Sequence, residues 1–243
     1  MDTKEKNIAV ILAGGSGSRF GADRPKQFLE VAGKMIIEHT IEAFHRHEGI
    51  DEIAIVTRHD YVSEVQQMAE RNAYTKVRHV LCGGKERYHS TLAALQAYSD
   101  TEGHMLIHDA VRPLVTQRII TDCLTALREY DAVDVAVPTT DTIIELDPQG
   151  RLSRIPQRSL LRNVQTPQAF TISTLRRAFT LALQDPAFLP TDDISVVFRY
   201  LPDTPITVVN GDTTNIKITY PEDLAFAERN LTHNPQPTTH NPQ

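Results

Sequence analysis

NIAVILAGGSGSRFGADRPKQFL, residues 7–29, is the stretch that decides the fold. After Asn7, residues 8–13 form an unbroken apolar run rich in Ile and Val, and 7–13 is typical of a strand buried on both faces of a parallel sheet. The glycines that follow allow a positive φ and bring backbone N–H groups close to a ligand. Arg19 and Lys26 add two positive charges. The combination indicates a phosphate-binding loop.

Each of these features also has a simpler explanation. A glycine turn after a strand is common, and most Arg and Lys side chains are only solvated. The loop lacks the Lys-Ser/Thr ending of a P-loop. The run Gly14-Gly15-Ser16-Gly17 is not followed, at the required spacing, by the last glycine of the G-x-G-x-x-G dinucleotide fingerprint. The loop alone therefore leaves the ligand open.

Composition limits the class of protein. At 243 residues and 40% hydrophobic content, the chain can form one large α/β domain or two small ones, and no change in composition argues for two. The net charge of −6 argues against general binding to nucleic acid or to an anionic membrane. Cys82 and Cys123 have no metal-binding spacing, and no apolar leader or membrane-length run occurs. We expect a cytoplasmic protein without a membrane or nucleic-acid partner.

Apolar periodicity predicts alternating strands and helices along most of the chain. The predicted strands are 7–13, 52–56, 77–81, 105–107, 133–137, 206–209 and 215–218. The predicted helices are 36–44, 61–68, 87–98, 119–127, 172–183, 193–199 and 221–230. This order is typical of an α/β fold with a mostly parallel central sheet.

One segment departs from this rhythm. Residues 142–146 and 152–155 read as two short strands joined by the turn Asp147-Pro148-Gln149-Gly150. A hairpin arm of about 140–158 that leaves the sheet must bury its apolar face elsewhere, and a symmetric partner subunit would serve. We expect a single domain over 1–230 and a disordered tail over 231–243, because the tail has almost nothing to bury.

Two further places suggest ligand contacts. Arg87 and Ser90 fall in the first turn of a predicted helix, where free N–H groups and the helix dipole favour an anion. Asp109 follows a predicted strand, at the edge where open α/β sheets bind ligands. It could hold Mg²⁺ or a ribose hydroxyl, or it could be a turn carboxylate paired with Arg112.

Taken in order, six motifs resemble the CTP-dependent polyol-phosphate cytidylyltransferases, namely the 2-C-methyl-D-erythritol 4-phosphate and ribitol-5-phosphate enzymes. The motifs are LAGGSGSR (12–19) with PKQF (25–28), GGKER (83–87) with Ser90, HDAVRP (108–113), Asp141-Thr142, QTPQ (165–168) and Asn215-Ile216-Lys217. The resemblance covers residues 7 to about 230. It implies a Rossmann-like three-layer nucleotidyltransferase fold, Mg²⁺ as cofactor, and a homodimer that exchanges its arms.

The resemblance also implies roles for particular residues. Catalytic cations that hold the triphosphate are Arg19, Lys26 and Lys217. Nucleotide-binding residues are Ala13, Gly14, Gly15, Gly17, Gly84, Lys85, Arg87, Ser90, Asp109 and Ala110, with Asp109 also the metal ligand. Acceptor-binding residues are Arg112, Thr142, Arg158 and Thr166, of which Thr142 and Arg158 would act in the neighbouring subunit.

The acceptor is predicted less directly. This sequence resembles the ribitol enzymes around residues 12–15, 109–113, 132–143 and 155–158. It resembles the methylerythritol enzymes around residues 163–170 and 191–193. The balance favours ribitol 5-phosphate, with 2-C-methyl-D-erythritol 4-phosphate as the alternative. A sugar-1-phosphate nucleotidyltransferase shares only the opening loop. A non-catalytic nucleotide-binding regulator would be expected to have lost one of the three cations.

Overall fold

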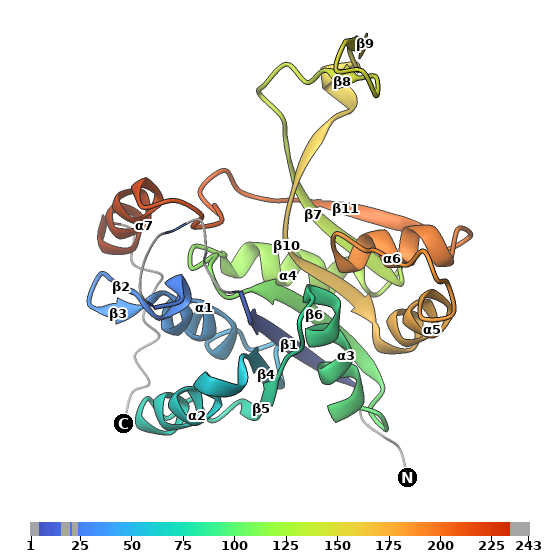
Figure 1. Cartoon of the computed structure of the whole chain (residues 1–243). Helices are drawn as coiled ribbons and strands as arrows, with labels where there is room; N and C mark the ends of the chain where they lie inside the picture. The colour runs from blue at the N-terminus through green and yellow to red at the C-terminus, as the bar shows by residue number, and fades with distance from the viewer. Residues whose placement is uncertain (1–4, 16–19, 21–23, 234–243) are drawn as a thin grey trace.

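A seven-stranded sheet forms the centre of the protein in a computed structural model that describes residues 5–15, 20 and 24–233 (Figure 1). The strand order is β11-β7-β10-β6-β1-β4-β5. The bounds are β1 (Lys6–Ala13), β4 (Glu52–Thr57), β5 (Val77–Cys82), β6 (Gly103–Asp109), β7 (Ala132–Pro138), β10 (Arg162–Thr171) and β11 (Ile206–Asn210). All pairs are parallel except those of β10, which runs antiparallel to β6 and β7. The predicted α/β class with a mostly parallel sheet is confirmed.

Helices cover both faces of the sheet and make three layers (Figure 1). One face packs on α1 (Ile36–His45), α2 (Val62–Arg71) and α4 (Gln117–Ala126), and the other on α3 (Arg87–Ala97), α5 (Ile172–Ala182) and α6 (Asp193–Tyr200). Burial of β1 on both faces explains why residues 8–13 are all apolar. Ile8 and Val10 enter one core, Ala9 and Ile11 enter the other, and all four are fully buried. Burial of each larger side chain contributes roughly 1.5–3 kcal/mol.

A small third cluster lies beside the main sheet. It joins α7 (Glu222–His233) to a hairpin of β2 (Glu30–Val31) and β3 (Lys34–Met35), which the sequence analysis did not predict. The last helix continues three residues past its predicted end, because Leu231 packs against this cluster. The tail prediction is therefore wrong for 231–233. Residues 234–243 lie outside the described part of the chain.

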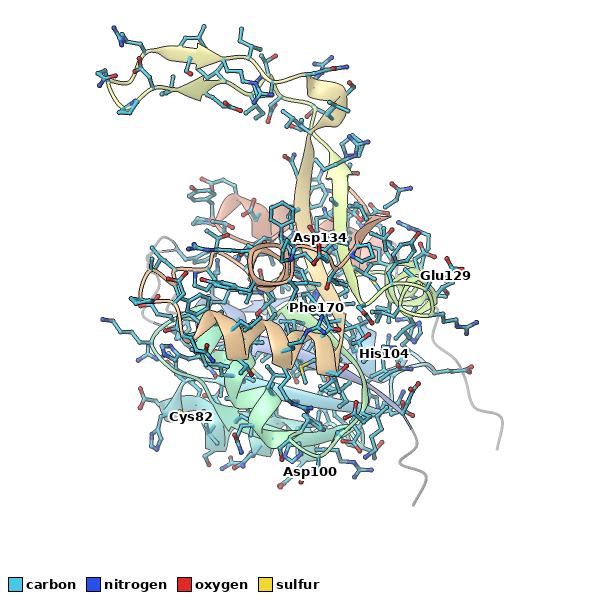
Figure 2. The ribbon with its side chains drawn as sticks, turned by 90° about the vertical axis from the view of Figure 1, so that its right-hand side faces the viewer. Cys82, Asp100, His104, Glu129, Asp134 and Phe170 are labelled. Atoms are coloured by element: carbon cyan, nitrogen blue, oxygen red, sulfur yellow. The ribbon has the colours of Figure 1, made fainter. Side chains whose placement is uncertain are left out.

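The predicted hairpin arm is present and stands clear of the body (Figures 1 and 2). It carries β8 (Glu145–Leu146), β9 (Leu152–Arg154) and a 3-10 turn at Arg158–Leu160. Its paired strands are shorter than predicted. The turn is closed by Oδ1 of Asp147, which accepts from the backbone N–H groups of Gln149 and Arg151 at 3.0 and 2.9 Å.

Two predictions about strands were wrong. β10 was missed, because its polar residues and Pro167 break any apolar pattern. Conversely, the predicted strand 215–218 joins no sheet among the described residues. Its alternating apolar side chains have another cause: Ile218 is buried in the small third cluster, and its N–H donates to the Val111 carbonyl at 2.9 Å. No described helix is both long and apolar enough to cross a membrane.

Candidate active site

A cavity of about 560 Å³ lies where β1 and β6 end, a volume typical of small-molecule sites. Parallel strands of an open sheet direct their following loops to this edge. The lining residues are Leu12, Ala13, Gly14, Gly15, Lys26, Gln27, Arg58, Gly84, Lys85, Glu86, Arg87, Ser90, Asp109, Val111 and Lys217. Five of these carry a positive charge and two a negative charge. The site therefore suits a polyanion, although the whole chain is acidic.

Gln27 holds the backbone after β1 in place. It is 2% exposed, and its Nε2 donates to the carbonyls of Ala13 and Gly15 at 2.7 and 3.0 Å. These bonds fix the backbone on either side of Gly14, and both Gly14 and Gly15 line the cavity. Lys26 precedes Gln27 in a short 3-10 helix (Lys26–Phe28) and lines the same wall.

Asp109 is the anion among the cations. Nζ of Lys217 lies 2.8 Å from its Oδ2, Nε of Arg87 lies 3.9 Å from its Oδ1, and Nε of Arg112 lies 4.0 Å from Oδ2. Burial by itself raises the pKa of Asp109, but Lys217 and Arg87 outweigh it and hold that pKa well below its ordinary value. The carboxylate is therefore ionised throughout the neutral range and keeps these cations in position.

A buried histidine supports Asp109 from behind. The backbone N–H of Asp109 donates to Oγ1 of Thr166 at 3.1 Å, and that oxygen lies 3.0 Å from Nδ1 of His108. Nε2 of His108 lies 3.1 Å from the Arg112 carbonyl, an acceptor, so Nε2 carries the proton and Nδ1 accepts from Thr166. Burial lowers the pKa of His108 to about 4. His108 is therefore neutral and structural.

The first turn of α3 forms the opposite wall. Arg87 pairs with Asp193, which is 1% exposed and also accepts from Oγ1 of Thr91 at 2.6 Å. Burial alone lowers the pKa of Arg87, and the nearby carboxylates of Asp193 and Asp109 raise it to a net increase. Ser90, 5% exposed, also lines this wall. Arg87 and Ser90 thus bring a positive charge and a hydroxyl from one helical turn into the cavity lining.

Comparison with known proteins identifies the family to which this chain belongs. Residues 7–233 match the family model described as IspD: 2-C-methyl-D-erythritol 4-phosphate cytidylyltransferase. The chain belongs to the IspD family. It is 44% identical to the enzyme of that name from Thermobifida fusca over 90% of this chain and 91% of the relative.

Two further comparisons bear on fold and acceptor. The crystal structure of 4-diphosphocytidyl-2C-methyl-D-erythritol synthase from Anaerococcus prevotii has a TM-score of 0.82 and 33% identity, covering 94% of this chain and 99% of that one. A bifunctional ribulose 5-phosphate reductase/CDP-ribitol pyrophosphorylase from Haemophilus influenzae is 42% identical over 93% of this chain and 48% of the relative. The IspD-type chain is thus a cytidylyltransferase of nucleotidyltransferase fold. The expectation of ribitol 5-phosphate as acceptor is less well supported than its alternative.

Ten of the residues predicted for this IspD-type site line the cavity together: Lys26, Lys217, Ala13, Gly14, Gly15, Gly84, Lys85, Arg87, Ser90 and Asp109. Others do not. Ala110, Arg112 and Thr166 lie beside or behind Asp109, and the hydroxyl of Thr166 is already bonded within the protein. Thr142 and Arg158 lie on the exposed arm. Gly17 and Arg19 fall outside the described residues.

Several residues in or next to the site were not predicted from the sequence, and three of them show why. Gln27 belongs to a quoted motif, but its role depends on two carbonyls that only the fold brings near. Arg58 directly follows β4, and its place at a strand end was a usable signal. Asp193 reaches Arg87 from a distant helix, and no local pattern predicts that contact.

Proposed function

We propose that this enzyme transfers the cytidylyl group of CTP to the phosphate of 2-C-methyl-D-erythritol 4-phosphate and releases diphosphate. The family match over residues 7–233 carries this choice of acceptor. Ribitol 5-phosphate is the second candidate, because the Haemophilus influenzae relative named a CDP-ribitol pyrophosphorylase is 42% identical. The acceptors differ by a methyl branch and one carbon of chain, which is worth only about 1–3 kcal/mol of discrimination.

The chemistry requires cations rather than a covalent intermediate. An acceptor phosphate oxygen attacks the α-phosphorus of CTP, the bond from that phosphorus to the bridging oxygen breaks, and diphosphate leaves with the electron pair. Charge on the phosphorus-bound oxygens must be stabilised while this happens. Lys26 and Lys217 line the cavity and are assigned this role, with Arg19 as a further predicted cation. Asp109 holds Lys217 through the 2.8 Å contact.

The residues present also fit Mg²⁺. Among the described residues, no group of three or more His, Cys, Asp or Glu side chains could form a complete metal site. Mg²⁺ does not need one, because it is commonly bound by one or two carboxylates together with substrate phosphates. Asp109 is the buried carboxylate in the cavity, with Arg87 3.9 Å from its Oδ1. Asp109 is therefore the proposed protein ligand. The ion would neutralise charge on the phosphate oxygens.

The nucleoside is assigned to the part of the cavity where Ser90 lies close to Gly14. Backbone at Ala13 and Gly14, together with Ser90 and Gly84, would frame the cytosine edge, while Arg87 and Lys85 supply positive charge. The close packing there supports the assignment. A Cβ on Gly83 would lie 2.6 Å from Oγ of Ser90, so a side chain at that position would displace the hydroxyl. Fixed donors and acceptors can discriminate cytosine from uracil.

Of the residues predicted for the acceptor phosphate, Arg112 and the partner's arm are assigned to it, in a homodimer, whereas the hydroxyl of Thr166 is already bonded to Asp109 and His108. Apolar side chains on and near the arm are 41–77% exposed: Ile143, Ile144, Leu146, Leu152, Ile155 and Leu160. An isolated arm would leave this surface in water, whereas a second copy would cover it. Thr142 and Arg158 would then reach the neighbouring cavity.

Release of diphosphate tests the proposal. The enzyme is incubated with CTP and Mg²⁺ plus either acceptor, and with UTP in place of CTP. We expect kcat/KM to be highest for CTP with 2-C-methyl-D-erythritol 4-phosphate. A higher value with ribitol 5-phosphate would select the second candidate, and equal rates with UTP would overturn the assignment of the cytosine site. Near-normal turnover of Lys26→Ala would remove that residue from the mechanism.

A further inference from the structure

Lys217 lies on a segment outside the sheet, joined to it at one end by the N–H of Gly211, which donates to the Ala136 carbonyl of β7 at 2.9 Å. Residues 211–219 are in neither a helix nor a strand of the described chain, although the segment follows β11 directly. Its backbone makes one main-chain bond to the β6 side of the site, from the N–H of Ile218 to the Val111 carbonyl at 2.9 Å. A cation that must be placed within a fraction of an ångström needs more support than this.

Gln165 supplies that support from β10. It is 6% exposed, and its Nε2 donates to the Asp212 carbonyl at 2.8 Å while its Oε1 accepts from the Asp212 N–H at 3.3 Å. The side-chain amide thus pairs with the backbone as a neighbouring strand would. A Cβ on Gly211 would lie 2.4 Å from Oε1 of Gln165, so a larger residue at 211 would push the amide away.

Asn215 completes the attachment two residues before Lys217. It is fully buried, and its Nδ2 donates to Oε1 of Gln165 at 3.2 Å and to the Thr166 carbonyl at 3.0 Å. Both donors are used, which defines the orientation of the amide. The Asn215 carbonyl in turn accepts from Nη1 of Arg112 at 2.8 Å.

Asp109 is held by the same strand. Thr166, directly after Gln165, binds the backbone N–H of Asp109 through its hydroxyl at 3.1 Å. Gln165 and Thr166, adjacent on β10, therefore position the two partners of the Lys217–Asp109 ion pair. They occur at the point where the register of β10 against β7 shifts. Such irregularities often direct side chains into functional sites.

We infer that Gln165, together with Asn215, is a positioning residue for Lys217 in the transfer step. The inference rests on the proposed role of Lys217. Gln165 lies outside the set that lines the cavity, so it acts through the 212–217 segment rather than on substrate. Since a displacement of about 1 Å can lower a rate by about 100-fold, loss of the attachment should lower kcat more than it raises KM for CTP.

A double-mutant cycle between Gln165 and Lys217 tests this. Gln165→Met, which keeps the length but not the hydrogen bonds, should lower kcat by about 10- to 100-fold and change KM for CTP by less than about threefold. In a Lys217→Met background the same substitution should lower kcat by less than about twofold, because the group it positions is gone. An equal loss in both backgrounds would overturn the inference. A loss in KM alone would do so too.

Gln168→Met is the matched control. Gln168 is a buried glutamine of the same strand, but its Oε1 accepts from the N–H groups of Asp193 and Ile194 at 3.1 and 3.3 Å, not from the Lys217 segment. Its effect on kcat should therefore be similar in both backgrounds. If Gln168→Met and Gln165→Met show equal coupling to Lys217, the coupling is general loosening of the fold, and the inference fails.

Folding and the proposed function are controlled separately. If Gln165→Met does not fold, as judged by its thermal unfolding, Asn215→Ala enters the same cycle with the same expected coupling, and additivity there overturns the inference. Lys217→Met alone tests the underlying assignment. Near-normal turnover of Lys217→Met would overturn the role proposed for Lys217, whereas slow turnover with additive Gln165 effects would overturn only the positioning role.

Discussion

Nζ of Lys217 lies 2.8 Å from Oδ2 of Asp109, although one residue follows the last parallel strand and the other ends β6. Arg87 and Arg112 approach the same carboxylate from two other elements. One anion thus organises three cations around the cavity. Removing one partner of a buried charge pair leaves the others uncompensated, so the consequences of altering Asp109 can be predicted.

Asp109→Asn should lower kcat by about 10²–10³-fold, the loss that follows removal of one group that stabilises transition-state charge, because Lys217 loses the anion that holds it. Lys217 holds the pKa of Asp109 below its ordinary value. The ionised carboxylate of Asp109 therefore stabilises the fold fully above the unfolded-state pKa, and this contribution is lost only as the pH falls towards the lower, folded-state pKa. The variant should therefore also unfold at a lower temperature at pH 7.5. Steady-state kinetics and thermal melts measure both, with the exposed Asp203→Asn as control. Turnover near wild type would contradict the prediction.

Asp193→Asn should weaken CTP binding. Asp193 pairs with Arg87 and accepts from Thr91, and without its charge the guanidinium loses its main partner. An energy of about 1.4 kcal/mol would raise KM for CTP about tenfold, with a smaller change in kcat. Asp122→Asn, which removes an exposed carboxylate 2.9 Å from Arg118, should leave both constants unchanged. Equal KM values for the two variants would count against Asp193.

Asp134→Asn should flatten one pH dependence of stability. Asp134 is 7% exposed on β7, inside the body of the molecule (Figure 2). Its Oδ1 accepts from Nε2 of Gln168 at 3.2 Å, and the same nitrogen donates to Asp192 at 3.1 Å. Burial, with a smaller contribution from Asp192, raises the pKa of Asp134 to about 6. The folded protein therefore binds a proton more tightly than the unfolded chain does.

Because the pKa of Asp134 is higher in the folded protein than in the unfolded chain, protonation of Asp134 stabilises the fold. The stability contributed by protonated Asp134 is complete below about pH 4 and is lost as the pH rises through 6, at a total cost of about 3 kcal/mol. Asp134→Asn should thus be more stable than wild type at pH 7.5, and the difference should vanish near pH 4. Urea titrations at several pH values measure it, with the exposed Asp100→Asn as control. A difference independent of pH would contradict a raised pKa of Asp134.

Mixing two inactive variants tests the shared site. In an arm-exchanged dimer, Arg158→Ala would damage the partner's site and Lys217→Met its own. A heterodimer then holds one intact site and one doubly altered site. Random exchange should restore about a quarter of wild-type activity, since about half of the dimers are mixed and each has one working site. No recovery after subunit exchange, or a monomeric mass with full activity, would contradict the shared site.

Local sequence predicted most of the elements of this fold. Apolar periodicity is a local signal, and buried runs such as residues 7–13 appear as strands wherever the chain places them. It failed at β10, where Gln165, Thr166 and Gln168 are polar because they bind other parts of the site rather than fill the core. It also failed at 215–218, where alternation reflects one buried isoleucine and not a sheet.

The sequence by itself determined most of the strands and helices and their order, the Gly-rich loop, the protruding arm and several of the cations that line the cavity. Each depends on residues close together in the chain. The tertiary structure decided which charges meet: Lys217 with Asp109, Arg87 with Asp193, and Gln165 with the segment that carries Lys217. These contacts join distant segments, and their strength depends on burial and on short distances, such as the 2.8 Å between Lys217 and Asp109, that no local pattern encodes.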